Sequence, residues 1–450
     1  MLLHDELILK IEKLSNLGFG LARHDGQVVF VKNACPQDNV KAKIIKITKN
    51  YAVAEIIEII DPSPHRVTPF CPMQKICGAC QLQFIDYNYQ LELKKEIVQD
   101  SMKSIAGQNF EVKNVIPSPK QKECRRKIQY SIAQPKNSDR LKIGYYKDKS
   151  HDVVNIKYCP IQPQLCDDVV NYIRENACKF GITGYNEKIH SGDLRHLVIR
   201  SSVTTGKILV VLVINSQKTS SNLLNFAKAI YNNFQNHISG VCVNFNDKKT
   251  NLILTKNTKC LCGEDFINEK ICDINFQVGP NTFFQVNPES AENIFQFIKK
   301  HIKNNFINPV VLDAYAGITA FGFVLSDICK EVVSVEECLE SVELARTVQK
   351  INNISNIELN HMDAGEFFSK ESRKFDLVIL DPPRKGCSIE SLNYAKKLAK
   401  SQIIYISCNP ATLARDLKYL VEIGAKVEYI QPFDMFCHTY HIESVAIISV

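Results

Sequence analysis

The pattern of apolar and polar positions predicts a small β-structure at the start of the chain. Short apolar runs follow one another there, and the dipeptide Asp25-Gly26 between two of them is a strong signal for a hairpin turn. The runs are residues 7–11, 20–24, 27–31, 40–47 and 51–57. Five short strands within residues 1–60 predict an OB-like closed β-barrel, a frequent platform for nucleic acids. A packing or dimerisation module is the alternative interpretation.

A mixed region follows from residue 61 to residue 275. It begins with the linker Asp61–His65, continues through a cysteine-rich stretch, and contains a helical pattern at residues 88–106. Strands are predicted at 196–200 and 209–215, within an otherwise mixed pattern of strand and helix. We therefore expect a central α+β domain.

Residues 276–450 alternate apolar strands with helical patterns. The predicted strands are 309–313, 331–336, 377–381, 402–408, 426–430 and 444–450. Such alternation predicts a largely parallel sheet with helices on both faces, as in Rossmann-like α/β domains. The last two strands are joined without a helical pattern, which favours an antiparallel strand closing the sheet.

Composition restricts the class of protein. The chain has 450 residues, of which 45% are hydrophobic and 23% charged, which excludes a largely disordered, collagenous or coiled-coil protein. Asp5 and Glu6 stand where a signal peptide needs positive charge. The longest apolar run, 208–214, is far shorter than the roughly 20 residues that span a bilayer. We expect a cytoplasmic protein that does not cross a membrane.

Positive charge is concentrated in residues 120–157, the basic segment. It holds eleven Lys or Arg and four acidic residues, an excess equal to the net charge of +7 of the whole chain. Tyr130, Tyr145 and Tyr146 lie within it and Tyr158 follows it. Cations that neutralise phosphates, together with rings that stack on bases, suit single-stranded nucleic acid. A solvated basic face is the alternative.

The loops after the first two strands of the last domain suggest a nucleoside-binding site. Gly317 allows a tight turn, and Glu336, 19 residues later, can bind ribose hydroxyls at the end of the second strand. Thr319 replaces the middle glycine of a dinucleotide fingerprint, which leaves no obvious place for a pyrophosphate. S-adenosylmethionine, which has a ribose and no phosphate, fits better.

The loop after the next strand reads Asp381-Pro382-Pro383-Arg384. Methylases of exocyclic amines carry an aromatic ring after a similar Pro-Pro, where it stacks on the target base. Arg384 in that place argues against amine methylation.

Cys408 is the candidate nucleophile. It precedes Asn409, a good helix cap, and Pro410, a good first helical residue, so the helix dipole is expected to favour its thiolate. A thiolate that adds to carbon 6 of a pyrimidine makes carbon 5 nucleophilic towards a methyl sulfonium. A base must then remove the carbon 5 proton, and Glu443 is the candidate.

At these residues the chain resembles the RNA uracil-5-methyltransferases, and most closely the bacterial branch that methylates 23S ribosomal RNA and carries a [4Fe–4S] cluster. The motifs are Gly18–Arg23 in a TRAM-like barrel, Phe284–Asn287, Asp381–Gly386, Ser407–Asp416 and His441–Ser444. The resemblance implies that Cys408 is the nucleophile and Glu443 the base. It also implies that S-adenosylmethionine contacts Gln285, Tyr315, Glu336 and Asp381.

Two residues depart from the family pattern near these motifs. Ala320 stands where relatives often have a polar residue, so no cofactor contact is carried over to it. Cys437 stands where a proline is usual, which would loosen the loop before Glu443. Neither change removes a catalytic group.

Cys71, Cys77 and Cys80 have the spacing C-x5-C-x2-C, which is typical of an iron–sulfur loop completed by a distant fourth cysteine. Zinc sites more often use two C-x2-C pairs, and zinc remains the alternative metal. By resemblance the fourth ligand is Cys159, and Cys166 is the alternative.

The sequence thus predicts a monomeric enzyme that methylates carbon 5 of one uridine in 23S ribosomal RNA, as free or partly assembled RNA. Transfer RNA is the alternative substrate. A non-catalytic RNA-binding assembly factor is the alternative of another class. We expect three domains: the barrel (1–60), the central iron–sulfur domain (61–275) and the methyltransferase domain (276–450).

Overall fold

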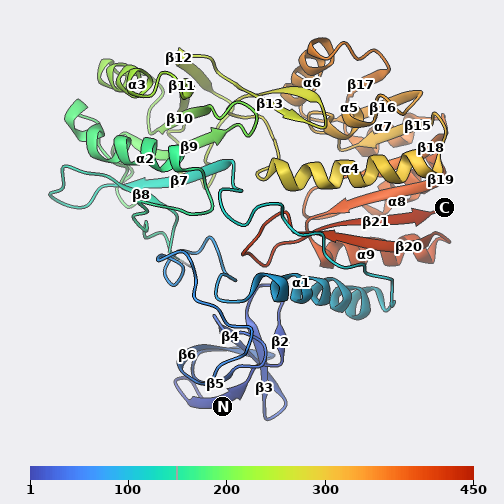
Figure 1. Ribbon diagram of the computed structural model, residues 1–450, viewed down its shortest axis with the longest axis horizontal. Helices are drawn as coiled ribbons and strands as arrows, with labels where there is room; N and C mark the ends of the chain where they lie inside the picture. The colour runs from blue at the N-terminus through green and yellow to red at the C-terminus, as the bar shows by residue number, and fades with distance from the viewer. Residues whose placement is uncertain (148–149) are drawn as a thin grey trace. The chain divides into compact units, whose positions relative to one another are not determined.

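The computed structural model describes residues 1–147 and 150–450, which form two compact units (Figure 1). The first unit comprises residues 1–74, 79–118 and 368–450, and the second comprises 75–78 and 119–367. Asp148 and Lys149 of the basic segment lie outside the described residues. No helix in the described part of the chain is both long and apolar enough to cross a membrane.

The first unit begins with the predicted barrel. Its strands are β1 (Glu6–Lys10), β2 (Lys13–Leu14), β3 (Gly20–His24), β4 (Gln27–Lys32), β5 (Asn39–Ile47) and β6 (Tyr51–Asp61), in the order β1-β5-β6-β4-β3-β2. The sheet closes because β1 and β2 belong to one continuous stretch, which pairs with β5 at one end and with β3 at the other. The turn Asp25-Gly26 joins β3 and β4 as the sequence predicts.

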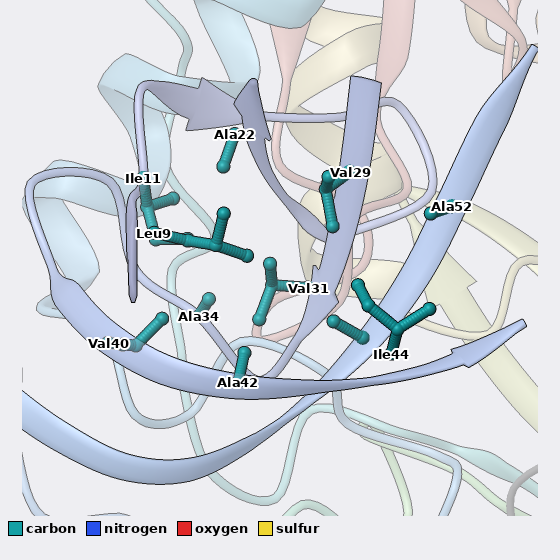
Figure 2. Packing of buried hydrophobic residues seen from close by; sticks show 11 residues of the cluster. Leu9, Ile11, Ala22, Val29, Val31, Ala34, Val40, Ala42, Ile44 and Ala52 are labelled. Atoms are coloured by element: carbon teal, nitrogen blue, oxygen red, sulfur yellow. The ribbon is translucent and has the colours of Figure 1, made fainter. Parts of the chain in front are cut away.

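Small and β-branched side chains fill the interior of this barrel (Figure 2). The buried residues are Leu9, Ile11, Ala22, Val29, Val31, Ala34, Val40, Ala42, Ile44, Ala52 and Ala54. Most of them alternate with outward-facing residues along their strands, as a pleated strand with one buried face requires. Hydrophobic burial therefore holds the barrel together.

Asp38 joins the barrel to the segment that follows it. Its fully buried carboxylate accepts hydrogen bonds from the backbone N–H of Cys35 (2.6 Å) and of Ser63 (2.9 Å). The Arg66 guanidinium binds both carboxylate oxygens, at 2.7 Å and 2.6 Å. A bidentate pair of this kind is strong, and it fixes the chain after β6 against the barrel.

The rest of the first unit is a four-stranded sheet flanked by helices. The strands β18 (Phe375–Leu380), β19 (Ala399–Ser407), β21 (Glu443–Ser449) and β20 (Lys426–Phe433) lie side by side in that order. β18 and β19 run parallel, whereas β21 runs antiparallel to both β19 and β20. The prediction of an antiparallel closing strand is confirmed. The helices are α1 (Tyr87–Ser101) with a π-helical turn (Met102–Ala106), α8 (Ile389–Leu398) and α9 (Pro410–Glu422).

The second unit contains a mixed sheet in the order β12-β11-β10-β9-β7-β8. Its strands are β7 (Lys127–Ala133), β8 (Lys142–Gly144), β9 (Leu194–Ser201), β10 (Ile208–Ile214), β11 (Ile238–Phe245) and β12 (Thr258–Gly263). β10 is buried along its whole length, which explains its unbroken apolar sequence. The helices α2 (Gln164–Asn176) and α3 (Ser221–Asn233) and the hairpin of β13 (Ile267–Ile271) and β14 (Ile274–Val278) complete this part.

A second set of strands in this unit is parallel, in the order β17-β16-β15. These strands are β15 (Val310–Ala314), β16 (Glu331–Glu336) and β17 (Ile357–His361). Their helices are α4 (Pro288–Asn305), α5 (Ala320–Leu325), α6 (Leu339–Ile351) and α7 (Ala364–Lys370). β15 and β16 match the predicted strands closely, but β17 has no counterpart among them.

We predict that Asp38→Ala lowers the free energy of unfolding by about 3 kcal/mol or more, because the change leaves the Arg66 charge and two backbone donors without their buried partner. Chemical denaturation followed by circular dichroism measures the loss. Glu55→Ala, which removes an ion pair to Lys32 with one partner about half exposed, should cost less than about 1 kcal/mol. Equal losses for the two variants would contradict the role assigned to Asp38.

Candidate active site

The pairing of β19 with β21 brings the predicted nucleophile and base together. The last pair of this antiparallel ladder is Ser407 opposite Ser444. Cys408 follows the last residue of β19, and Glu443 is the first residue of β21. The Glu443 charge acts on the Cys408 thiol, so the two groups lie near each other. The sheet therefore brings the thiol and the carboxylate together, although they are far apart in sequence.

The chain beyond Cys408 forms the helix cap that the sequence predicts. The Asn409 side chain accepts a hydrogen bond from the N–H of Ala411 at 3.1 Å, and Pro410 is the first residue of α9. Ser407 Oγ accepts a hydrogen bond from the N–H of Asn409 at 3.1 Å. Cys408 is thus held between a strand end and a capped helix.

Asp381 and Arg384 complete this site from the loop after β18. β18 and β19 run parallel and in register, with Leu380 opposite Tyr405, so their carboxyl ends lie at one edge of the sheet. The carbonyl of Arg384 accepts a hydrogen bond from Thr412 Oγ1 at 3.2 Å, and its guanidinium lies 3.1 Å from His441 Nδ1. The loop is therefore tied to both neighbouring parts of the site.

Burial and neighbouring charges shift the pKa values of three groups in this site, Asp381, Glu443 and Cys408. Burial raises the pKa of Asp381 to about 7. Burial, and then the Asp381 charge, raise the pKa of Glu443 well above its usual range, while the Arg384 guanidinium opposes the shift. Burial and the Glu443 charge raise the pKa of the Cys408 thiol, and Arg384 again acts in the other direction.

Burial and the nearby carboxylates thus oppose the thiolate that the helix dipole is expected to favour at Cys408. They also outweigh the opposite effect of Arg384 on the Cys408 pKa. A proton taken up by either carboxylate removes a negative charge that opposes the thiolate. The site as a whole can thus hold or pass a proton, as general acid–base chemistry requires.

Asp416 is a supporting residue of this site that the sequence reasoning did not single out. Its fully buried carboxylate accepts hydrogen bonds from the Cys387 N–H at 2.9 Å and from the Tyr405 hydroxyl at 2.5 Å. Gly386 has φ of +76°, and a Cβ there would collide with the Asp416 carboxylate. Asp416 thus fixes the end of the loop that carries Asp381 and Arg384. The sequence signal for Asp416 is its place at the end of the Ser407–Asp416 motif.

In the second unit, a hydrogen bond joins Gly317 and Glu336, the two residues from which the sequence predicts a nucleoside site. Glu336 Oε2 accepts a hydrogen bond from the Gly317 N–H at 2.8 Å, and Oε1 accepts one from the Cys338 N–H at 2.9 Å. Tyr315, Gly317 and Thr319 all have positive φ, so the loop after β15 is tightly curled. The carboxylate keeps further lone pairs, which can accept hydrogen bonds from ribose hydroxyls.

Gln285 lies elsewhere in this unit, just before α4. It lines a small cavity together with the basic residues Arg126, Lys127 and Arg200 and the ring of Phe284. Burial, and then the Arg200 charge, lower the pKa of Lys127 to about 8. The buried Glu269 lines it too, so the cavity carries charges of both signs.

Part of the basic segment is buried, which corrects one expectation. Tyr130 is completely buried and donates a hydrogen bond to Gln162 at 2.9 Å, so it cannot stack on a base. Arg126 lines the cavity and lies 3.8 Å from the Glu289 carboxylate. Tyr158, which is half exposed, remains available as an aromatic surface.

The four predicted cluster cysteines are all unbridged thiols. Cys71 and Cys80 belong to the first unit, and Cys77 and Cys159 to the second. Cys77 and Cys159 both act on the pKa of Tyr145, so both lie near its phenol. Within residues 1–147 and 150–450, no group of three or more His, Cys, Asp or Glu side chains is arranged to hold a metal ion.

A buried network fixes the backbone at Cys159. The Asp167 carboxylate accepts a hydrogen bond from the Cys159 N–H at 3.1 Å and another from the Gln162 amide at 2.6 Å. Burial raises the pKa of Asp167 to about 6. Cys166, the alternative ligand, is fully buried in α2, and burial raises its pKa to about 12.

Comparison with known proteins identifies relatives along the whole chain. Residues 86–449 match the family model described as tRNA (uracil-5-)-methyltransferase, and residues 5–57 match the TRAM domain. An RNA methyltransferase of Clostridium tetani is 35% identical over 98% of this chain and 95% of its own. One of Gloeobacter violaceus is 37% identical over 97% of this chain and 94% of its own.

A solved structure is similar over the same length. It is the tRNA (uracil-54, C5)-methyltransferase of Pyrococcus abyssi in complex with S-adenosyl-L-homocysteine. The TM-score is 0.79 at 26% identity, and the match covers 98% of this chain and 100% of that one. The fold is thus that of S-adenosylmethionine-dependent methyltransferases preceded by TRAM strands.

Proposed function

Since this chain belongs to the tRNA (uracil-5-)-methyltransferase family, we propose that it methylates carbon 5 of one uridine in 23S ribosomal RNA by covalent catalysis. Family membership makes it an S-adenosylmethionine-dependent RNA methyltransferase. The observation that carries the proposed mechanism is that Cys408 and Glu443 lie near each other, at the neighbouring ends of β19 and β21. A nucleophile and a base on the same edge are what addition and elimination at neighbouring ring carbons require.

S-adenosylmethionine supplies the methyl group as an electrophilic sulfonium. The Cys408 thiolate adds to carbon 6 of the uracil ring, and carbon 5 becomes nucleophilic and takes the methyl group. Glu443 then removes the proton from carbon 5, the double bond between carbons 5 and 6 re-forms, and the thiolate leaves. The raised pKa of Glu443 makes it a stronger base than an ordinary carboxylate.

We assign cofactor binding to Gln285, Tyr315, Glu336 and Asp381. The loop after β15 and the carboxylate at the end of β16 suit the nucleoside part, with Glu336 on the ribose. Asp381 shares its sheet edge with Cys408, which suits a place near the reacting carbon.

The barrel is assigned to RNA binding. Lys43 and Lys46 are exposed on β5, whereas Lys41 is paired with Glu6 at 2.8 Å. Exposed lysines on a small barrel can neutralise phosphates, and the TRAM match supports this role.

We further propose that Cys71, Cys77, Cys80 and Cys159 hold a [4Fe–4S] cluster with a structural role. Four unbridged thiols are the donor set of such a cluster, and two of them, Cys77 and Cys159, lie near the Tyr145 phenol. No step of the methylation mechanism moves an electron. A cluster there would fix the basic segment, because Cys159 follows that segment directly.

The covalent mechanism predicts opposite behaviours for two variants. Glu443→Gln should add to RNA and transfer the methyl group, then release the product slowly, so a protein–RNA adduct survives on denaturing gels. Cys408→Ala should bind RNA and form no adduct and no product. Absence of an adduct with Glu443→Gln, in protein that binds RNA normally, would remove Glu443 as the base.

The RNA target is tested by mapping 5-methyluridine in a deletion strain by mass spectrometry. We expect the loss of one 5-methyluridine from 23S ribosomal RNA. Transfer RNA is the second candidate, because the similar Pyrococcus abyssi enzyme acts on tRNA. Loss confined to transfer RNA would replace the ribosomal assignment and leave the mechanism intact.

The choice of the fourth cysteine is tested by iron content. Protein purified without oxygen should be brown and contain about four irons per chain. Cys159→Ser should lose most of this iron, whereas Cys166→Ser, which changes the buried alternative, should keep it. The reverse result would exchange the two cysteines, and one zinc in colourless protein would overturn the cluster.

A further inference from the structure

A buried ion pair lies at the start of the loop that leads to Glu443. Lys94 on α1 places its Nζ 2.6 Å from Asp434 Oδ1, and both side chains are completely buried. The same Nζ donates a hydrogen bond to the carbonyl of Phe436 at 3.1 Å. Burying two charges is costly unless the geometry is excellent, so such a pair is weak evidence for a purely stabilising role.

Tyr87, at the start of α1, binds the other oxygen of Asp434. Its hydroxyl donates to Asp434 Oδ2 at 2.7 Å and accepts a hydrogen bond from the N–H of Ser118 at 2.9 Å. Burial, and then the Asp434 charge, raise the pKa of Tyr87, so the hydroxyl keeps its proton. Both carboxylate oxygens of Asp434 are therefore held by side chains of α1.

The middle of the same loop is held by its contacts with Gln90 and Leu82. His438 has φ of +63°, a left-handed conformation that costs free energy in a residue other than glycine. Its carbonyl accepts a hydrogen bond from the N–H of Leu82 at 2.9 Å. Gln90 Nε2 lies 3.4 Å from His438 Nδ1 and donates to the Leu82 carbonyl at 3.0 Å.

The start of the loop is fixed through its backbone as well. The N–H of Asp434 donates to the Ile116 carbonyl, and the N–H of Ile116 donates to the Pro432 carbonyl, each at 2.9 Å. Residues 111–116 thus pair with β20 as a short parallel edge. The loop between β20 and β21 is therefore restrained from its first residue to its middle, and Glu443 is the first residue after it.

From these contacts we infer that α1 positions the proposed base, with Lys94 and Asp434 as positioning residues for Glu443. The inference rests on the proposed function and deepens it. The pair fixes loop 434–442 so that the Glu443 carboxylate faces carbon 5 of the methylated ring. In that step the C5–H bond breaks, the proton passes to Glu443, and its electrons form the C5–C6 double bond as the bond to Cys408 breaks.

The positioning role predicts which reaction step depends on the pair of Lys94 and Asp434. Addition of Cys408 and methyl transfer need β19 and the cofactor, whereas release needs Glu443 in place. Loss of the pair should therefore slow release selectively. A shift of the base by about 1 Å can cost about 100-fold in rate.

The experiment uses full-length Lys94→Met under single-turnover conditions with two RNAs, one with uridine and one with 5-fluorouridine at the target. Fluorine at carbon 5 cannot leave as a proton, so adduct formation on that RNA reports addition and methyl transfer alone. Lys103→Met, which changes an exposed lysine in the π-helical turn after α1, is the matched control.

Lys94→Met should form the 5-fluorouridine adduct at a rate within about threefold of wild type. On uridine RNA it should release product about 10- to 100-fold more slowly and accumulate the adduct. Lys103→Met should match wild type on both RNAs. Equal slowing on both RNAs, or no change on either, would overturn the positioning role.

A second variant separates positioning from stability. Lys94→Met combined with Asp434→Asn removes the unpaired buried charge, so its Tm should recover towards wild type while release stays slow. Recovery of release together with Tm would show that the pair acts only through stability. If wild-type protein forms no adduct on 5-fluorouridine RNA, the proposed function itself fails and the inference falls with it.

Discussion

Antiparallel pairing between β19 and β21 decides where the reactive groups meet. Because Ser407 lies opposite Ser444, the next residues outward are Cys408 and Glu443, at the edge where the parallel strands also end. A slip of one residue would turn every side chain of β21 to the other face. If β21 ran parallel to β19, its first residue would lie at the opposite edge of the sheet. The reversed direction of this one strand is thus the condition for the proposed chemistry.

This register brings the reactive groups together only if the ends of the strands are held in place. Two fully buried carboxylates serve this purpose on either side of the site. Asp416 binds the loop after β18, and Asp434 binds α1 through Lys94 and Tyr87. Asp381 and Glu443 are instead the proposed cofactor contact and the proposed base, and burial shifts their pKa values upward. Acidic residues thus have two roles, to fix a loop or to take part in the proposed reaction. The number of hydrogen-bond donors around each residue decides which role it has.

Local sequence predicted the parts of the structure that depend on neighbouring residues. The cap at Asn409, the hairpin at Asp25-Gly26 and the antiparallel last strand are examples. β17 is absent from the predicted strands because only its first residue is buried, so it lacks the apolar run of an inner strand. The burial of Tyr130 depends on which face of β7 meets the core, and composition cannot show this. Lys94 looks like a surface lysine in a helical pattern, since its partner is 340 residues away.

The central claim is that Glu443, which lies near Cys408, removes the carbon 5 proton after methyl transfer. Target RNA with tritium at carbon 5, together with S-adenosylmethionine carrying a labelled methyl group, measures both events in one reaction. Wild-type enzyme should release one tritium for each methyl group transferred. Glu443→Gln should transfer up to one methyl group per enzyme and retain the tritium. Equal tritium release and methyl transfer in that variant, at the wild-type rate, would contradict the account.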